Sequence, residues 1–93
     1  MDQLRAKIDV IDENILYALA SRMKISSQIG EYKKANNVAI LQTSRWDAVL
    51  AKVIAKAKEH GLSENFVKDV FNAIHEASVE VQNKVISGET SQD

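Results

Sequence analysis

Two basic side chains, Arg22 and Lys33, interrupt an apolar helical pattern near the start of the chain. At about 100° per residue, both project from the centre of the stripe that contains Leu4, Ile15 and Ile29. A cation in the middle of an apolar face is costly unless it is paired, and no acidic residue lies one turn away on that line. Either the two side chains reach solvent or the acids of another helix, or they converge on a buried anionic ligand.

Two uncharged polar residues interrupt the apolar pattern of a later helix in a similar way. Ser78 falls inside the stripe that contains Ile74 and Val81, and Gln82 lies beside this stripe one turn later. Taken alone, Ser78 is typical of a serine bonded back to its own helix, and Gln82 is typical of a boundary residue. Cations and neutral donors without a nucleophile or a base favour electrostatic stabilisation of a reacting anion over covalent or acid–base catalysis.

The composition disfavours several other classes of function. The 93 residues make one domain, and a net charge of −1 argues against nucleic acid or a membrane as the main partner. The chain has no cysteine, and its two histidines, His60 and His75, belong to no metal-binding motif, so no metal or cofactor is expected. Because the N-terminus shows neither a secretion signal nor an apolar run of about 18 residues, a cytoplasmic location is expected.

The first predicted helix, from Asp2 to Lys34, determines the rest of the expected fold. It would be about 50 Å long, whereas a compact chain of about 100 residues has a radius of gyration near 13 Å. Its apolar stripe therefore extends beyond what one chain can cover, which predicts a homodimer. Arg5 lies about 25 Å from Arg22 along this helix. The two can serve one small ligand only if Arg5 comes from a second chain, although a lone Arg5 is typical of a solvated surface residue.

The remaining sequence predicts two shorter helices and completes an all-α fold. The second helix is expected to be capped by Thr43 or Ser44, and it should end near Gly61 in a left-handed cap. The third helix should run to about Val85. Residues 87–93 consist of Gly, Ser, Thr, Gln and acids, so they are expected to form a disordered tail or the stub of a linker after a domain of residues 1–86.

Short motifs spread over residues 3–86 resemble the all-helical chorismate mutases. The matching pieces are Leu4-Arg5 with Ile8, Ile11-Asp12-Glu13, Ala20-Ser21-Arg22, Ile29-Gly30-Glu31-Tyr32-Lys33, Ser44-Arg45 and Glu76-Ala77-Ser78 to Gln82. Each piece is unspecific, but together they occur in the order and at the spacing of the family, and they include the polar residues noted above. The resemblance implies three helices per chain in an intertwined homodimer.

The resemblance also implies a reaction and a set of site residues. Chorismate, a dianion, would rearrange to prephenate by a concerted [3,3] shift without a cofactor, in phenylalanine and tyrosine biosynthesis. The implied catalytic residues, which donate hydrogen bonds to the ether oxygen, are Lys33 and Gln82. The implied substrate-binding residues are Arg5 of the partner subunit, Arg22, Arg45, Ser78 and Gln42. Because the amide of Gln82 does not titrate, the rate should be nearly flat from about pH 5 to 8.

Two positions depart from the pattern of the family. Gln42 stands where many of these enzymes carry an acid, and Trp46 stands where a glutamate normally accepts the ring hydroxyl of the substrate. An indole N–H can only donate. Either Gln42 or a backbone carbonyl therefore replaces the glutamate, or Trp46 packs in the core and the contact with the hydroxyl is weaker.

Two other functions fit the same resemblance. Isochorismate-pyruvate lyases use the same fold and the same scheme of carboxylate binding, and a non-catalytic dimerisation or regulatory module would share the fold without turnover. The presence of Arg5, Arg22, Lys33 and Gln82 argues against the non-catalytic module, and product analysis with both substrates would separate the favoured mutase from the lyase. Domains of this kind are often fused to other enzymes, so a fused or associated shikimate-pathway enzyme is a further expected partner.

Overall fold

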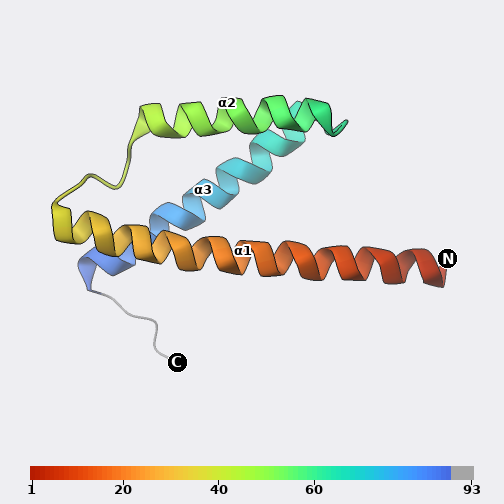
Figure 1. Ribbon diagram of the computed structural model, residues 1–93, viewed down its shortest axis with the longest axis horizontal. Helices are drawn as coiled ribbons and strands as arrows, with labels where there is room; N and C mark the ends of the chain where they lie inside the picture. The colour runs from red at the N-terminus through yellow and green to blue at the C-terminus, as the bar shows by residue number, and fades with distance from the viewer. Residues whose placement is uncertain (89–93) are drawn as a thin grey trace.

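Three helices form the whole regular structure of residues 1–88, which are the residues that the computed structural model describes. They are α1 (Asp2–Asn36), α2 (Thr43–Glu59) and α3 (Glu64–Ser87), and the prediction of an all-α chain with three helices is confirmed. In Figure 1, α3 runs diagonally between α1 and α2. Within the described residues α3 packs against both other helices, whereas α1 and α2 do not pack against each other. α3 therefore holds the other two helices in place.

The ends of α1 and α2 follow from residues that tolerate a left-handed backbone. α1 ends where Asn37 adopts a φ of 58°, a conformation that asparagine enters more easily than most residues. α2 ends where Gly61 adopts a φ of 69°, and the amide of Leu62 reaches back to the carbonyl oxygen of Ala57 at 2.9 Å. The first stop lies at Asn36-Asn37, a pair whose sequence favours a helix end just after the predicted Lys34, and the second lies at the predicted Gly61.

The start of α2 differs from its prediction. The helix begins at Thr43 with Gln42 as its N-cap residue, and no side chain accepts a hydrogen bond from the first turn. The carbonyl oxygen of Gln42 already accepts from the amide of Trp46 at 3.0 Å. Thr43 and Ser44 therefore lie inside the first turn of α2, one and two residues after the N-cap position. The predicted cap is wrong.

The two ends of α3 also add detail to the prediction. Ser63 is the N-cap residue, and its hydroxyl oxygen accepts from the amide of Phe66 at 3.3 Å. At the other end the helix continues to Ser87, and Gly88 closes it with a φ of 82°. Ser87, expected in the tail, thus belongs to α3, and the rest of the predicted tail, residues 89–93, lies outside the described residues.

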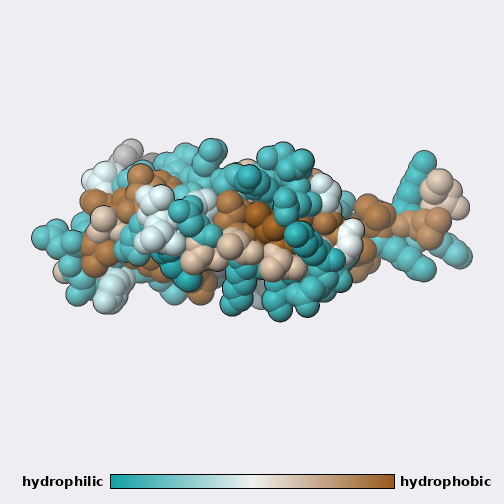
Figure 2. Space-filling model, turned by 90° about the horizontal axis from the view of Figure 1, so that it is seen from above, coloured by the Kyte–Doolittle hydropathy of each residue, from teal (hydrophilic) through white to brown (hydrophobic). Residues whose placement is uncertain are grey.

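A single chain buries little apolar surface. Among residues 1–88 the buried apolar side chains are those of Ala57 and Val67, at 3% and 6% exposure. The first half of the predicted α1 stripe stays more than half exposed: Leu4, Ile8, Ile11 and Ile15. The radius of gyration is 16.0 Å, and Figure 2 shows apolar side chains on the N-terminal end of α1, which projects beyond the rest of the molecule. The fold thus splits α1 into a packed half and a free arm.

Candidate active site

A cavity of about 390 Å³ lies among the packed half of α1, the connection to α2, α2 itself and α3. Six of the seven residues that the sequence selected line this one cavity: Arg22, Lys33, Gln42, Arg45, Ser78 and Gln82. They come from segments up to sixty residues apart in the chain, and the packing of α3 against both α1 and α2 brings them together. The seventh residue, Arg5, lies on the exposed arm of α1 and does not line the cavity of its own chain.

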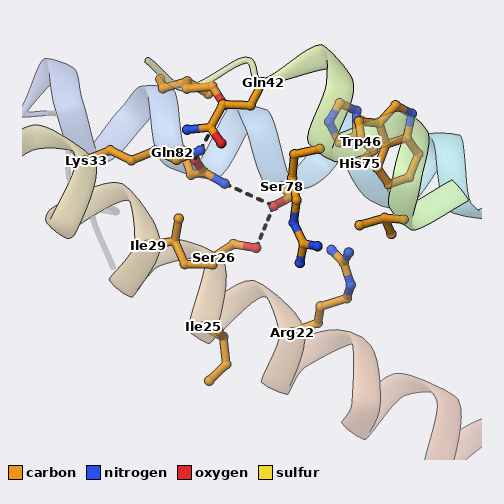
Figure 3. Close-up of a pocket in the computed structure, with 13 residues that line it drawn as sticks. Arg22, Ile25, Ser26, Ile29, Lys33, Gln42, Trp46, His75, Ser78 and Gln82 are labelled. Atoms are coloured by element: carbon orange, nitrogen blue, oxygen red, sulfur yellow. Dashed lines mark hydrogen bonds between the residues drawn. The ribbon is translucent and has the colours of Figure 1, made fainter. Parts of the chain in front are cut away.

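Lys33 and Gln82 meet at one end of the cavity. The Nζ of Lys33 donates to the Oε1 of Gln82 at 2.9 Å (Figure 3). It also donates to the carbonyl oxygen of Ile40 at 2.9 Å. Both acceptors are neutral, and no ion pair holds this ammonium within residues 1–88. Burial disfavours the charged form and lowers the pKa of Lys33 below the usual value of a lysine. The site therefore holds an unpaired cation that an anionic ligand would stabilise.

A buried pair of serines extends the same network, and one of them escaped the sequence reasoning. The Nε2 of Gln82 donates to the Oγ of Ser78 at 3.3 Å, and this hydroxyl is hydrogen-bonded to the Oγ of Ser26. Ser26 is only 3% exposed and lines the cavity. The spacing could have indicated Ser26 as a site residue, because it lies seven residues before Lys33 and so shares a helix face with it. Nothing in the spacing indicates that α3 places Ser78 opposite it.

A glycine allows α1 and α3 to approach closely beside this network. Gly30 is buried, and a Cβ atom built on it would lie 3.2 Å from the Cα of Gln82 and 3.2 Å from the Cβ of Val85. Contacts this short require the neighbouring helix to move by a few tenths of an ångström. The absence of a side chain at Gly30 thus sets the helix separation at which Lys33 can reach Gln82.

An aromatic pair forms another part of the cavity wall. The rings of Trp46 and His75 stack with their centroids 4.0 Å apart and an angle of 17° between their planes (Figure 3). Both residues line the cavity and are half-buried. Gln42 lies on the exposed side, where its Nε2 donates to the carbonyl oxygen of Ala39 at 3.3 Å. The sequence did not select His75, because its position follows only from the packing of α2 on α3.

The charged side chains in the described lining are all positive. Arg22, Lys33 and Arg45 line the cavity, and no aspartate or glutamate does so among the described residues. Guanidinium groups present paired donors that match the oxygens of a carboxylate. The cavity is therefore suited to a small molecule that carries more than one negative charge.

Comparison with known families identifies the family of this chain. The family model for type II chorismate mutases matches residues 4–83, a range that covers most of all three helices. The chain belongs to the type II chorismate mutase family. This confirms the resemblance identified from the sequence, and it places the chain in a family of enzymes.

The relatives of this chain fall into two groups by the activity in their names. It is 34% identical over 74 residues to a 4-amino-4-deoxychorismate mutase of Streptomyces pristinaespiralis, covering 80% of this chain and 57% of that protein. A 4-amino-4-deoxychorismate mutase of Streptomyces venezuelae is 28% identical over 90 residues, with 97% and 87% covered. A bifunctional chorismate mutase/prephenate dehydratase of Buchnera aphidicola is 35% identical over 83 residues, which are 89% of this chain and only 22% of that protein. No solved structure gives a significant match.

Two other kinds of feature are absent from the described residues. Within residues 1–88, no three His, Asp or Glu side chains gather in a way that could hold a metal ion. In the same range, none of the helices combines enough length with enough apolar character to cross a lipid bilayer.

Proposed function

We propose that this chain converts chorismate to prephenate. In this rearrangement one C–O bond breaks and one C–C bond forms within the same molecule, so no atom is gained or lost. The observation that carries the proposal is the pair of Lys33 and Gln82, joined at 2.9 Å inside a cavity with three cations and no carboxylate in its described lining. Both side chains carry N–H donors for the ether oxygen, on which negative charge grows as the C–O bond breaks.

The arginines have a different role in the proposed reaction. Arg22 and Arg45 line the same cavity as Lys33 and would bind carboxylates of the substrate through paired N–H donors. Two fixed carboxylates hold the substrate in the compact conformer in which the new C–C bond can form. Holding this conformer removes part of the entropic barrier without any covalent intermediate.

We further propose that the enzyme is a homodimer in which the partner's Arg5 completes each cavity. Two features support this arrangement. Four apolar residues beside Arg5 on the arm of α1 are 51–58% exposed, which leaves a continuous apolar surface for a second chain. Arg5 is also separated from Arg22 by about 25 Å of rigid helix, so it cannot reach the cavity of its own chain.

A second substrate must be weighed because two relatives are named 4-amino-4-deoxychorismate mutases. The amino group of that compound is an ammonium at neutral pH, and it would add a positive charge to a lining that already has three. No aspartate or glutamate lines the cavity among the described residues to accept it. The charge balance therefore favours the neutral hydroxyl of chorismate.

The first experiment follows the absorbance of chorismate with purified protein and identifies the product. We expect prephenate, a much lower kcat/KM with 4-amino-4-deoxychorismate, and no release of pyruvate from isochorismate. Lys33→Ala should lower kcat about 100-fold or more, since it removes a donor at the developing oxyanion. The matched control is Lys34→Ala, the next residue of α1, whose Nζ lies 3.4 Å from the carbonyl oxygen of Val85 and outside the cavity lining.

Several outcomes would contradict the proposal. A folded dimer that turns over none of the three substrates would point to a non-catalytic module. Faster turnover of the amino compound would assign the chain to the activity of its Streptomyces relatives, and pyruvate release would assign it to the lyases.

We place the proposed reaction in phenylalanine and tyrosine biosynthesis, beside a second enzyme of that pathway. The support is that some relatives are bifunctional chorismate mutase/prephenate dehydratases, of which the matching segment is only 22% of the length. Co-purification of the native protein with a fused or bound enzyme of aromatic synthesis would test this.

A further inference from the structure

The orientation of the Gln82 amide is determined by its neighbours. The ammonium of Lys33 can only donate hydrogen bonds, so the Gln82 atom 2.9 Å from it must be the oxygen. The nitrogen of the same amide then points to the other side, 3.3 Å from the Oγ of Ser78 (Figure 3). One N–H of this amide is donated to Ser78, and this bond directs the second N–H, which the proposed reaction needs for the ether oxygen.

The hydroxyl of Ser78 has its own geometric requirement. While it accepts from Gln82, its single proton must go elsewhere, and the partner at hand is the Oγ of Ser26. All three side chains are nearly fully buried, at 3%, 7% and 6% exposure for Ser26, Ser78 and Gln82. Without Ser26, the Ser78 proton would turn to a carbonyl oxygen of its own helix, and the Ser78 lone pairs would rotate away from Gln82.

We propose that Ser26 is a positioning residue for the rearrangement. It holds the hydroxyl of Ser78, which in turn aims the Nε2 donor of Gln82 into the cavity. Ser26 lies on α1 and the other two residues lie on α3, so the contact also fixes the register of the two helices at the site. This inference rests on the proposed mutase function, because its readout is the turnover of chorismate.

The test compares Ser26→Ala with Ser27→Ala in the chorismate assay. The two variants make the same chemical change at adjacent positions of α1, but Ser27 does not line the cavity. We expect Ser26→Ala to lower kcat by about threefold to tenfold, as the loss of one neutral hydrogen bond does, with KM changed by less than about twofold. Ser27→Ala should match the parent in both constants.

A double-mutant cycle separates positioning from a merely structural role. If Ser26 acts through Gln82, Ser26→Ala should change kcat by less than about 1.5-fold in a Gln82→Ala background. Ser26→Cys, nearly isosteric but a weak hydrogen-bonding group, should give an intermediate kcat and serves if the alanine variant folds poorly.

Three results would overturn the proposal. They are an unchanged kcat in both Ser26 variants, an equal loss in the two backgrounds, and a rise in KM with kcat intact. Failure of the parent protein to consume chorismate, measured in the same assay, would instead overturn the proposed function.

Discussion

At the scale of single residues, the proposed chemistry depends on donors that keep their protons across the working pH range. Gln82 has an amide that never ionises, whereas its neighbour Lys33 carries a proton that burial makes easier to lose. The two donors of the proposed site should therefore respond differently to pH and to substitution.

Replacing the amide of Gln82 by an acid should make the enzyme dependent on pH. In Gln82→Glu, a protonated carboxyl group can still donate at low pH, but the ionised form has no proton and would instead pair with Lys33, 2.9 Å from the native oxygen. We expect a kcat about 100-fold or more below the parent near pH 8, rising as the pH falls. The parent should stay nearly flat from about pH 5 to 8, and Gln82→Ala should be slow at every pH. Parallel profiles for the parent and the glutamate variant would contradict this assignment.

The lowered pKa of Lys33 predicts an alkaline limit to activity. Because burial favours the neutral amine, Lys33 loses its proton at a lower pH than an ordinary lysine, and the donor and its charge are lost together. We therefore expect kcat/KM to fall as the pH rises toward the usual range of lysine. A bound dianion favours the ammonium, so the corresponding fall in kcat should lie at higher pH.

The control for this pH profile is His75→Asn, which removes the other ionisable side chain of the lining besides the arginines. It should leave the alkaline fall in place. If the fall disappears in His75→Asn, or occurs at the same pH for kcat and kcat/KM, Lys33 is not its source.

The residues that the sequence revealed share one property, and those that it missed share another. Arg22, Lys33 and Ser78 are polar groups in apolar helix faces, so periodicity alone exposes them. Ser26 and His75 acquire their places only through partners on another helix, Ser78 and Trp46 respectively. Pair contacts between helices depend on crossing angles and separations, which a one-dimensional pattern does not contain.

At the scale of elements, the crossing of α1 and α3 determines whether the two proposed donors meet. The two helices approach closely at Gly30, where an added Cβ would lie 3.2 Å from the backbone of Gln82. The sequence indicates Gly30 only as one member of a motif that resembles the chorismate mutases. Its use as a close contact emerges when the two helices are packed together.

Gly30→Ala should therefore impair activity more than stability. Alanine raises helix propensity by about 1 kcal/mol, while the crowding against α3 costs a similar amount. The free energy of unfolding should change by less than about 1 kcal/mol, but α3 must shift away from α1, and we expect kcat to fall severalfold. Urea titration beside steady-state kinetics would measure both quantities. A stable variant with full kcat would show that the helix separation is not critical.

Gly61→Ala is the matched control at the end of α2. A Cβ there would meet no atom within 4 Å, but the φ of 69° is strained for any residue with a side chain. We expect a loss of about 1 kcal/mol in the free energy of unfolding and an unchanged kcat. The two glycine variants should thus show opposite patterns, which would separate packing at the site from backbone strain.

At the scale of the whole molecule, the arm of α1 links the proposed site of one chain to another chain. If the partner's Arg5 completes the cavity, Arg5→Ala and Lys33→Ala damage the same site from different chains. In a mixed dimer of the two variants, one site would have both residues intact and the other neither. Random mixing of equal amounts should restore about a quarter of the parent activity. No recovery after mixing, although mixed dimers form, would place Arg5 and Lys33 in separate functions.

The small buried core of the single chain has a consequence for how the protein folds and assembles. With two buried apolar side chains in residues 1–88, one chain alone has little to offset the entropy lost on ordering a helix of 35 residues. For the proposed dimer, folding and association become one event, and refolding is then second order in chain concentration. A newly synthesised chain would therefore become active only after it associates with a second chain. At low expression the number of working sites would therefore rise with the square of the number of chains synthesised.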